Sequence, residues 1–289
     1  MKVKITSDST CDLPIELIRK YDIAVTSLTV TLGEASFQDG LDMDPEAIYP
    51  YVEQTGTLPK TSAVSIGGYC EVFRRWVEEG YEVVHFSLSS ELSSTYQNAC
   101  IAAEEVGHVS VVDSRNLSSG QGLIVLRAAE LAGEGADAQT ILQVCEQMIP
   151  NVETSFVIDT LDYLYKGGRC SALSAFGANL LKIKPCILVQ DGKMLPGKKY
   201  RGTADKVICS YAEDRLKDRT DIDASRVFLT HTRCSEGCVK RVEGLIREYL
   251  PDVKELIIST AGSTITTHCG PNCLGVLFVR KEGGTEPET

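Results

Sequence analysis

The chain has 289 residues, enough for two modest domains with cores of their own, and its 43% hydrophobic and 24% charged residues are typical of a globular protein. Its net charge of −11 argues against a nucleic-acid-binding protein, because such proteins need a basic surface. No apolar run approaches the roughly 20 residues that cross a bilayer, and the first residues are typical of a strand rather than a signal peptide, so we expect a cytoplasmic protein.

Strand-like and helix-like segments alternate through the first half of the chain. β-branched and apolar residues predict strands at residues 3–8, 23–32, 82–89 and 109–114. Amphipathic patterns predict helices at residues 13–21, from Pro45, at 67–79 and 92–106, and from about 121 and 137. Residues 58–65 are expected to form a loop. This alternation is typical of a parallel sheet covered by helices.

A second half of the chain begins near Asn151. Asp191 and Gly192 are a hairpin turn signal between two strand-like segments, 184–190 and 193–200. Further strands are expected at residues 155–159, 226–231, 255–260 and 274–280, with helices at 161–166, from Ser171 and between the later strands. The polar residues 282–289 are expected to form a flexible tail.

Hydroxyl-rich stretches follow the strands of the first half or open its helices. The polar stretches that follow strands lie at residues 7–12, 89–95 and 113–122, where parallel α/β sheets bind their ligands. Thr61 and Ser62 precede one helix, and Ser93 and Ser94 open another, so their hydroxyl and N–H groups suit an anion. The alternative is N-capping, which explains one hydroxyl in each helix without any ligand.

Nucleotide-binding motifs fail on inspection. Residues 192–198 spell G-K-M-L-P-G-K, the skeleton of a P-loop, but Lys199 stands where the motif needs Ser or Thr to hold Mg²⁺. The segment also falls in the expected hairpin and not between a strand and a helix. No G-x-S-x-G motif is present in the sequence. The chain is therefore expected to lack an ATP site and a nucleophile triad of its own.

Eleven cysteines leave two interpretations open. Two C-x3-C pairs, Cys234 with Cys238 and Cys269 with Cys273, have a spacing that zinc permits, with His231 and His268 as further ligands. A zinc-dependent hydrolase is therefore an alternative function. Most of the cysteines, however, lie in apolar stretches, where a free thiol fills a core as a small hydrophobic group.

Three more side chains are candidates for contact with an anionic group. His268 comes just before Gly270 and Pro271, so we expect it on a tight turn that can aim its ring. Arg169 and Arg201 lie beside glycines in expected loops, where a guanidinium group can meet a carboxylate or a phosphate.

Several motifs taken together resemble one family. They are S-D-S-T-C-D-L at 7–13, P-K-T-S at 59–62, L-S-S-T-Y-Q-N-A at 92–99, V-V-D-S and S-G-Q-G-L within 111–123, D-T-L-D-Y-L-Y-K-G-G-R at 159–169, L-L-K-I-K-P at 180–185 and H-C-G-P-N-C-L-G at 268–275. With them the chain resembles, almost end to end, the DegV-type proteins, the fatty-acid-binding subunits of bacterial fatty acid kinase.

The resemblance implies a fold and a function. The fold is a two-domain DegV-like α/β fold, with a parallel sheet flanked by helices in residues 1–150 and a mixed sheet in residues 151–281. A long-chain fatty acid lies in an apolar tunnel as the bound ligand, with no other cofactor. A separate kinase subunit carries ATP and converts the presented carboxylate to acyl phosphate, so this chain is a lipid-binding subunit and not an enzyme.

The resemblance also implies site residues. The carboxylate meets Thr61, Ser62, Ser93 and Ser94, with His268 nearby. Arg169 and Arg201 lie at the mouth and present the head group to the kinase. The chain departs from the family at Glu91, Ser94 and Asn272, where the family often has glycine. The first two changes reshape one wall of the site, whereas Asn tolerates the positive φ that a turn requires.

Overall fold

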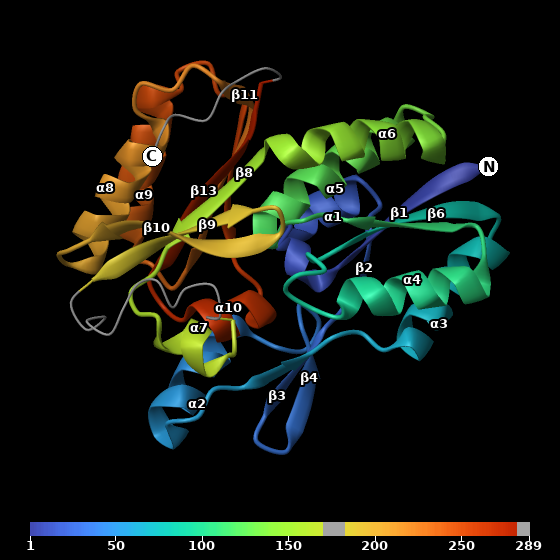
Figure 1. The fold of residues 1–289 in the computed structure, drawn as a ribbon, viewed down its shortest axis with the longest axis horizontal. Helices are drawn as coiled ribbons and strands as arrows, with labels where there is room; N and C mark the ends of the chain where they lie inside the picture. Colours follow the sequence, from blue (N-terminus) through green and yellow to red (C-terminus); the bar gives the residue numbers. More distant parts are fainter. Residues whose placement is uncertain (170–182, 282–289) are drawn as a thin grey trace.

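The first half of the chain forms a four-stranded parallel sheet in a computed structural model that describes residues 1–169 and 183–281 (Figure 1). The sheet order is β2-β1-β6-β7, from the strands β1 (Lys2–Asp8), β2 (Ala24–Thr26), β6 (Tyr81–Ser87) and β7 (Val109–Asp113). Successive residues of β6 face opposite sides. Val83 packs with α3 (Ile66–Glu78) and α4 (Thr95–Val106), and Val84 packs with α5 (Ser118–Gly133). The predicted parallel sheet covered by helices is confirmed.

The second half forms a six-stranded mixed sheet in the order β10-β9-β8-β13-β11-β12. Its strands are β8 (Val152–Val157), β9 (Lys184–Gln190), β10 (Lys193–Tyr200), β11 (Ile222–Thr232), β12 (Glu255–Thr260) and β13 (Cys273–Arg280). The neighbours β11 and β12 are parallel and the others antiparallel. One face is covered by α8 (Ala204–Leu216) and α9 (Glu236–Tyr249) (Figure 1). The predicted mixed sheet is confirmed, and so is the hairpin, whose turn residues Asp191 and Gly192 have φ of 48° and 80°.

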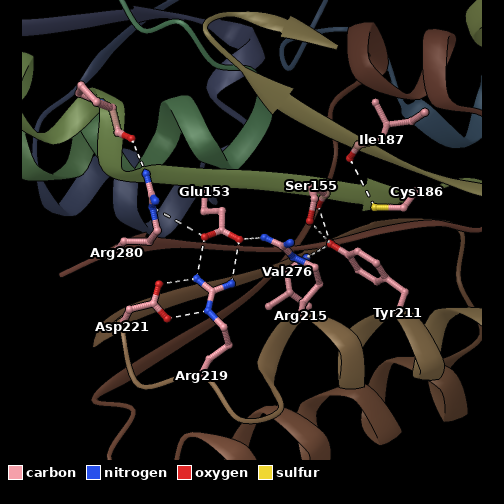
Figure 2. A network of polar contacts seen from close by, with 11 residues as sticks. Glu153, Ser155, Cys186, Ile187, Tyr211, Arg215, Arg219, Asp221, Val276 and Arg280 are labelled. Carbon is pink, nitrogen blue, oxygen red and sulfur yellow. Dashed lines mark hydrogen bonds and ion pairs between the residues drawn. The ribbon is translucent and has the colours of Figure 1, made fainter. Parts of the chain in front are cut away.

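Three arginines gather around Glu153 at the start of β8 (Figure 2). Arg219 donates to both carboxylate oxygens of Glu153, at 3.1 and 2.7 Å, and also pairs with Asp221. Arg215 and Arg280 pair with the same glutamate. Hydrogen bonds from Arg219 lower the pKa of Asp221. The network joins the end of α8 to β8 and β13, with three guanidinium groups around two carboxylates.

Helix α5 is buried between the two sheets. Twelve of its sixteen residues are buried, including the apolar run at residues 123–126. It contacts β1 and β6 of the first sheet and β8, β11 and β13 of the second (Figure 1). The core therefore crosses the predicted domain boundary at residue 150, through contacts of α5 with residues such as Phe228 and Leu277. The boundary itself stays a prediction.

A third, antiparallel sheet corrects two expectations. It has the order β4-β3-β5, from β3 (Thr29–Leu32), β4 (Ala35–Gln38) and β5 (Lys60–Ser62). The single strand predicted at 23–32 is wrong, because the chain leaves the parallel sheet after β2. Leu28 bonds there to Ser9 Oγ and to the N–H of Asp39 instead of to a neighbouring strand. The loop predicted at 58–65 contains β5, which is too short to be recognised without its partner β3.

The other elements lie around these sheets. They are η1 (Ser9–Cys11), α1 (Ile15–Lys20), η2 (Pro45–Ala47), α2 (Ile48–Thr55), α6 (Ala138–Met148), η3 (Ile149–Asn151), α7 (Asp162–Lys166) and α10 (Ser263–Cys269). Within residues 1–169 and 183–281, no helix has the length and apolar character needed to span a membrane. The helix predicted from Ser171 and the tail predicted at 282–289 lie outside the described residues.

The close packing of α5 can be tested at one glycine. A Cβ on Gly122 would lie 2.7 Å from the carbonyl oxygen of Cys11. We expect Gly122→Ala to lower the free energy of unfolding by about 1–3 kcal/mol through overpacking, although alanine is the better helix former. Gly133→Ala in the same helix, with open space around it, should leave stability unchanged or slightly higher. Urea unfolding measures both variants, and equal stability would contradict the close approach.

Candidate functional site

A cavity lies where the loops of the first sheet meet the small sheet, the β9–β10 hairpin and α10. Its empty volume is about 570 Å³ with the open space at its mouth included. It is lined by Leu28, Thr61, Ser62, Ala63, Leu88, Leu92, Ser93, Leu117, Phe156, Leu164, Arg169, Met194, Thr264, Ile265, His268 and Cys269.

Most of the cavity wall is apolar. Leu88 and Leu117 come from loops of the first sheet, whereas Phe156 and Met194 come from the second sheet, and all four belong to one buried cluster. A smaller void behind α10 shares four lining residues with the cavity and has an empty volume of about 340 Å³. The shared residues are Leu117, Phe156, Ile265 and Cys269. Apolar space thus continues from the cavity toward the second sheet.

The polar lining residues of the cavity include Thr61 and His268, which contact each other. Thr61 Oγ1 lies 2.9 Å from His268 Nε2, although 207 positions separate the two residues in the chain. The tight turn predicted for His268 is wrong, because the residue lies in the last turn of α10. The turn begins just beyond it, where Gly270 has φ 71° and Asn272 has φ 56°, so Asn272 takes the positive φ predicted for it.

His268 is held neutral by its surroundings. Burial, and to a smaller extent the charge of Arg169, lower the pKa of the imidazole to about 4. Its Nδ1 has no hydrogen-bond partner among the described residues and lies so close to Gly167 that a Cβ there would be 2.4 Å away. A buried N–H without a partner is less tolerable than an unpaired acceptor, so the proton belongs on Nε2, which donates to Thr61. The hydroxyl proton of Thr61 is then free to be donated to a ligand.

The hydroxyl groups predicted at the site differ in whether they cap a helix, line the cavity or do both. Thr61 and Ser62 are no caps, because α3 is capped by Ser65, whose Oγ accepts from Gly68 N–H at 3.1 Å. Ser93 does both, since its Oγ accepts from the N–H of Thr95 at 3.2 Å and also lines the cavity. Ser94 is exposed and outside the described lining. Its predicted contact stays a prediction.

The two predicted arginines lie in different surroundings. Arg169 lines the cavity and donates to the carbonyl of Gly167 at 2.7 Å. With His268 neutral, it carries the one formal charge among the described lining residues. Arg201 is exposed after the end of β10 and outside that lining. Its role at the mouth stays a prediction.

Thr264 is a polar lining residue that the sequence analysis missed. Its hydroxyl is buried and has no hydrogen-bond partner among the described residues. It lies four positions before His268 on α10, so both side chains are on one face of that helix. The i, i+4 spacing could have identified it, but only with α10 already recognised as a helix.

In the predicted polar stretch 7–12, Asp8 forms its hydrogen bonds within the protein. Asp8 is fully buried and accepts hydrogen bonds from Thr10, Ser87, Gln121 and the N–H of Leu88. Burial raises the pKa of its carboxyl, and these hydrogen bonds oppose that effect. Through Asp8 the stretch joins β1, β6 and α5.

The cysteine pairs do not form a metal site within residues 1–169 and 183–281. Burial raises the pKa of the Cys234 and Cys238 thiols to about 12. Cys234 Sγ donates to the carbonyl of Cys273 at 3.3 Å. No group of three or more His, Cys, Asp or Glu side chains in the described ranges could hold a metal ion. The zinc-hydrolase alternative therefore lacks a ligand set there.

Comparison with known proteins places the chain in a family. A family model described as "Uncharacterised protein, DegV family" matches residues 2–281. The chain belongs to the DegV family. It is 35% identical to a DegV relative from Thermotoga maritima named "Fatty acid-binding protein", over 95% of this chain and 96% of the relative.

Solved DegV structures have the same fold. A DegV family protein of Thermus thermophilus, described with fatty acid binding, aligns with a TM-score of 0.87 and 29% identity over 97% of this chain and 100% of the other. A protein of Eubacterium ventriosum described as stearic-acid-binding aligns with a TM-score of 0.81 and 27% identity, over 96% and 98% of the two chains. The family and the DegV-like fold predicted from the motifs are confirmed.

The neutral state of His268 predicts a pH effect on stability. Its pKa falls from 6.5 to about 4 on folding, so the unfolded chain takes up the proton first as pH falls through this window. Stability contributed by the neutral ring is therefore present above pH 6.5 and is lost toward pH 4. We expect His268→Gln to reduce the slope of unfolding free energy against pH by up to about 1.4 kcal/mol per unit. Urea unfolding at pH 7, 6 and 5 measures it, and equal slopes would contradict the burial of the ring.

Proposed function

We propose that this protein binds a long-chain fatty acid, with the acyl chain in the apolar cavity and the carboxylate near Thr61 and His268. The observation that carries the proposal is the Thr61–His268 pair in a mostly apolar cavity that also holds Arg169. Ser62 and Ser93 line the same cavity, and the unpaired hydroxyl of Thr264 adds a donor. The relatives described above as binding fatty acids support the proposal.

The energies of such a ligand are consistent with tight binding. Burying an acyl chain of about 16 carbons contributes roughly 0.8 kcal/mol per methylene, on the order of 10 kcal/mol before the costs of association. A carboxylate in an apolar cavity is costly unless several donors meet it. Each hydrogen bond to a charged group contributes about 1.5–3 kcal/mol, so two or three donors are needed, and hydroxyls of Thr61, Ser93 and Thr264 provide them.

The chain is proposed to present its lipid to a separate enzyme in the cytoplasm. The sequence has no convincing ATP motif, so phosphoryl transfer requires a partner. A fatty acid kinase subunit would transfer the γ-phosphoryl group of ATP to a carboxylate oxygen, giving acyl phosphate and ADP. Arg169 at the cavity and the exposed Arg201 are the cations proposed to orient the head group and the partner.

Solvent extraction followed by mass spectrometry tests lipid binding. Protein made in bacteria should release about one long-chain fatty acid per chain. Thr61→Val keeps the shape but removes the donor, and we expect about a tenfold loss of affinity for hexadecanoic acid, the size of one hydrogen bond to a charged group. Thr31→Val is the control, because its hydroxyl bonds to Ser36 on the same small sheet, away from the cavity. An empty wild-type protein, or a tightly bound ligand that is not a lipid, would overturn the proposal.

The presenter role predicts a separation of binding from use. Arg201→Ala should retain the bound acid but lower acyl-phosphate formation by the kinase of the same organism at least about tenfold, because a guanidinium contact to a carboxylate or phosphate is lost. Hydroxylamine trapping of the acyl phosphate measures the rate. Lys217→Ala, at an exposed cation after α8, is the control. Equal losses of lipid content and rate would contradict the role.

A further inference from the structure

Helix α10 is held at both ends by residues of the small antiparallel sheet or next to it. At its end, His268 contacts Thr61 of β5. At its start, Ser263 N–H donates to Asp39 Oδ1 at 2.7 Å, and Asp39 directly follows β4. Strand β3 lies between β4 and β5 and pairs with both, so it fixes Asp39 and Thr61 relative to each other.

The start of α10 is closely fitted to the carboxylate of Asp39. A Cβ on Gly262 would lie 3.1 Å from Asp39 Oδ1 and 2.9 Å from Asp12 Oδ1, so only glycine allows this approach. Asp12 accepts from the N–H of Gly262 at 2.9 Å, beside the bond from Ser263 to Asp39. The first N–H groups of a helix have no partner inside it, and carboxylates there are favoured by the helix dipole.

Asp39 is itself held firmly. It is 1% exposed, its Oδ2 accepts from Ser9 Oγ at 3.0 Å, and its own N–H donates to the carbonyl of Leu28 at 2.9 Å. Both carboxylate oxygens are thus used, one toward the first sheet's loop and one toward α10. A side chain fixed in this way can define where a seven-residue helix begins.

We infer that Asp39 is a positioning residue, which acts through the first turn of α10 to hold His268 against Thr61. The closed path runs from Asp39 along α10 to His268, across to Thr61, and back through β5, β3 and β4. The consequence for head-group binding rests on the proposed function, whereas the consequence for the His268 ring does not. Asp39 does not line the cavity in the described part of the chain, so it acts through α10 and not by contact with a ligand.

The ring of His268 gives a test that needs no ligand. Side-chain NMR of the four histidines across pH follows its titration in the wild type and in variants. We expect Asp39→Ala to release the ring from Thr61 and expose it to water. Because burial is the main cause of its lowered pKa, the pKa of His268 should then rise from about 4 toward 6.5. Asp39→Asn keeps an acceptor for Ser263 and should resemble the wild type. Asp44→Ala removes an exposed carboxylate that caps the neighbouring η2, and is the matched control.

Asp39→Ser is a second test variant, to be used if the alanine variant does not fold. It keeps a polar atom in the buried site, but its side chain is too short to reach Ser263, so it should release the ring in the same way. A His268 titration unchanged in the folded alanine or serine variant would overturn the inference. The same change in Asp44→Ala would also overturn it, because the effect would then not be specific to α10.

Ligand affinity separates positioning from general stability. We expect Asp39→Ala to weaken the binding of hexadecanoic acid about tenfold, because one hydrogen bond to the charged carboxylate is weakened. The affinity for hexadecan-1-ol should stay within about twofold of the wild-type value. Equal losses for the acid and the alcohol would mean that Asp39 only supports the fold, and would overturn the inference. If the wild type binds no acid, the proposed function fails, and the ring titration still decides the role of Asp39.

Discussion

Two buried carboxyl groups accept hydrogen bonds from the start of one helix in this protein. Burying a carboxylate without donors is costly, and the first N–H groups of a helix lack acceptors within it. Asp12 and Asp39 accept from Gly262 and Ser263, which joins loops of the first half of the chain to α10 in the second half. Because α10 carries His268, the contact of His268 with Thr61 at the cavity depends on these two hydrogen bonds.

The cavity belongs to neither half of the chain alone. Leu88 and Leu117 from the first half face Phe156 and Met194 from the second. The tip of the β9–β10 hairpin also contacts the first half of the chain, since Ser89 Oγ donates to the carbonyl of Gly192 at 2.8 Å. The buried helix α5 keeps the two sheets in one core, so the walls on both sides are fixed together.

The cavity suits a ligand that is apolar along its length and anionic at one end. A neutral imidazole that donates to Thr61 leaves the threonine proton available, and Arg169 provides positive charge without a competing carboxylate in the described lining. His268 of the H-C-G-P-N-C motif contributes a polar contact at the cavity, whereas Cys269 of the same motif belongs to its buried lining.

Features that depend on near neighbours in the chain were predictable from the amino-acid sequence. Helix periodicity located α3, the Asp-Gly turn located the β9–β10 hairpin, and family motifs named five residues that line one cavity: Thr61, Ser62, Ser93, Arg169 and His268. The pairing of β3 with β5 and the helix at residues 263–269 could not be predicted in this way, because both depend on contacts between distant parts of the chain. The reason is physical: a three-residue strand and a seven-residue helix are too short to be stable alone, and partners up to 250 positions away, such as Asp12 for Gly262, stabilise them.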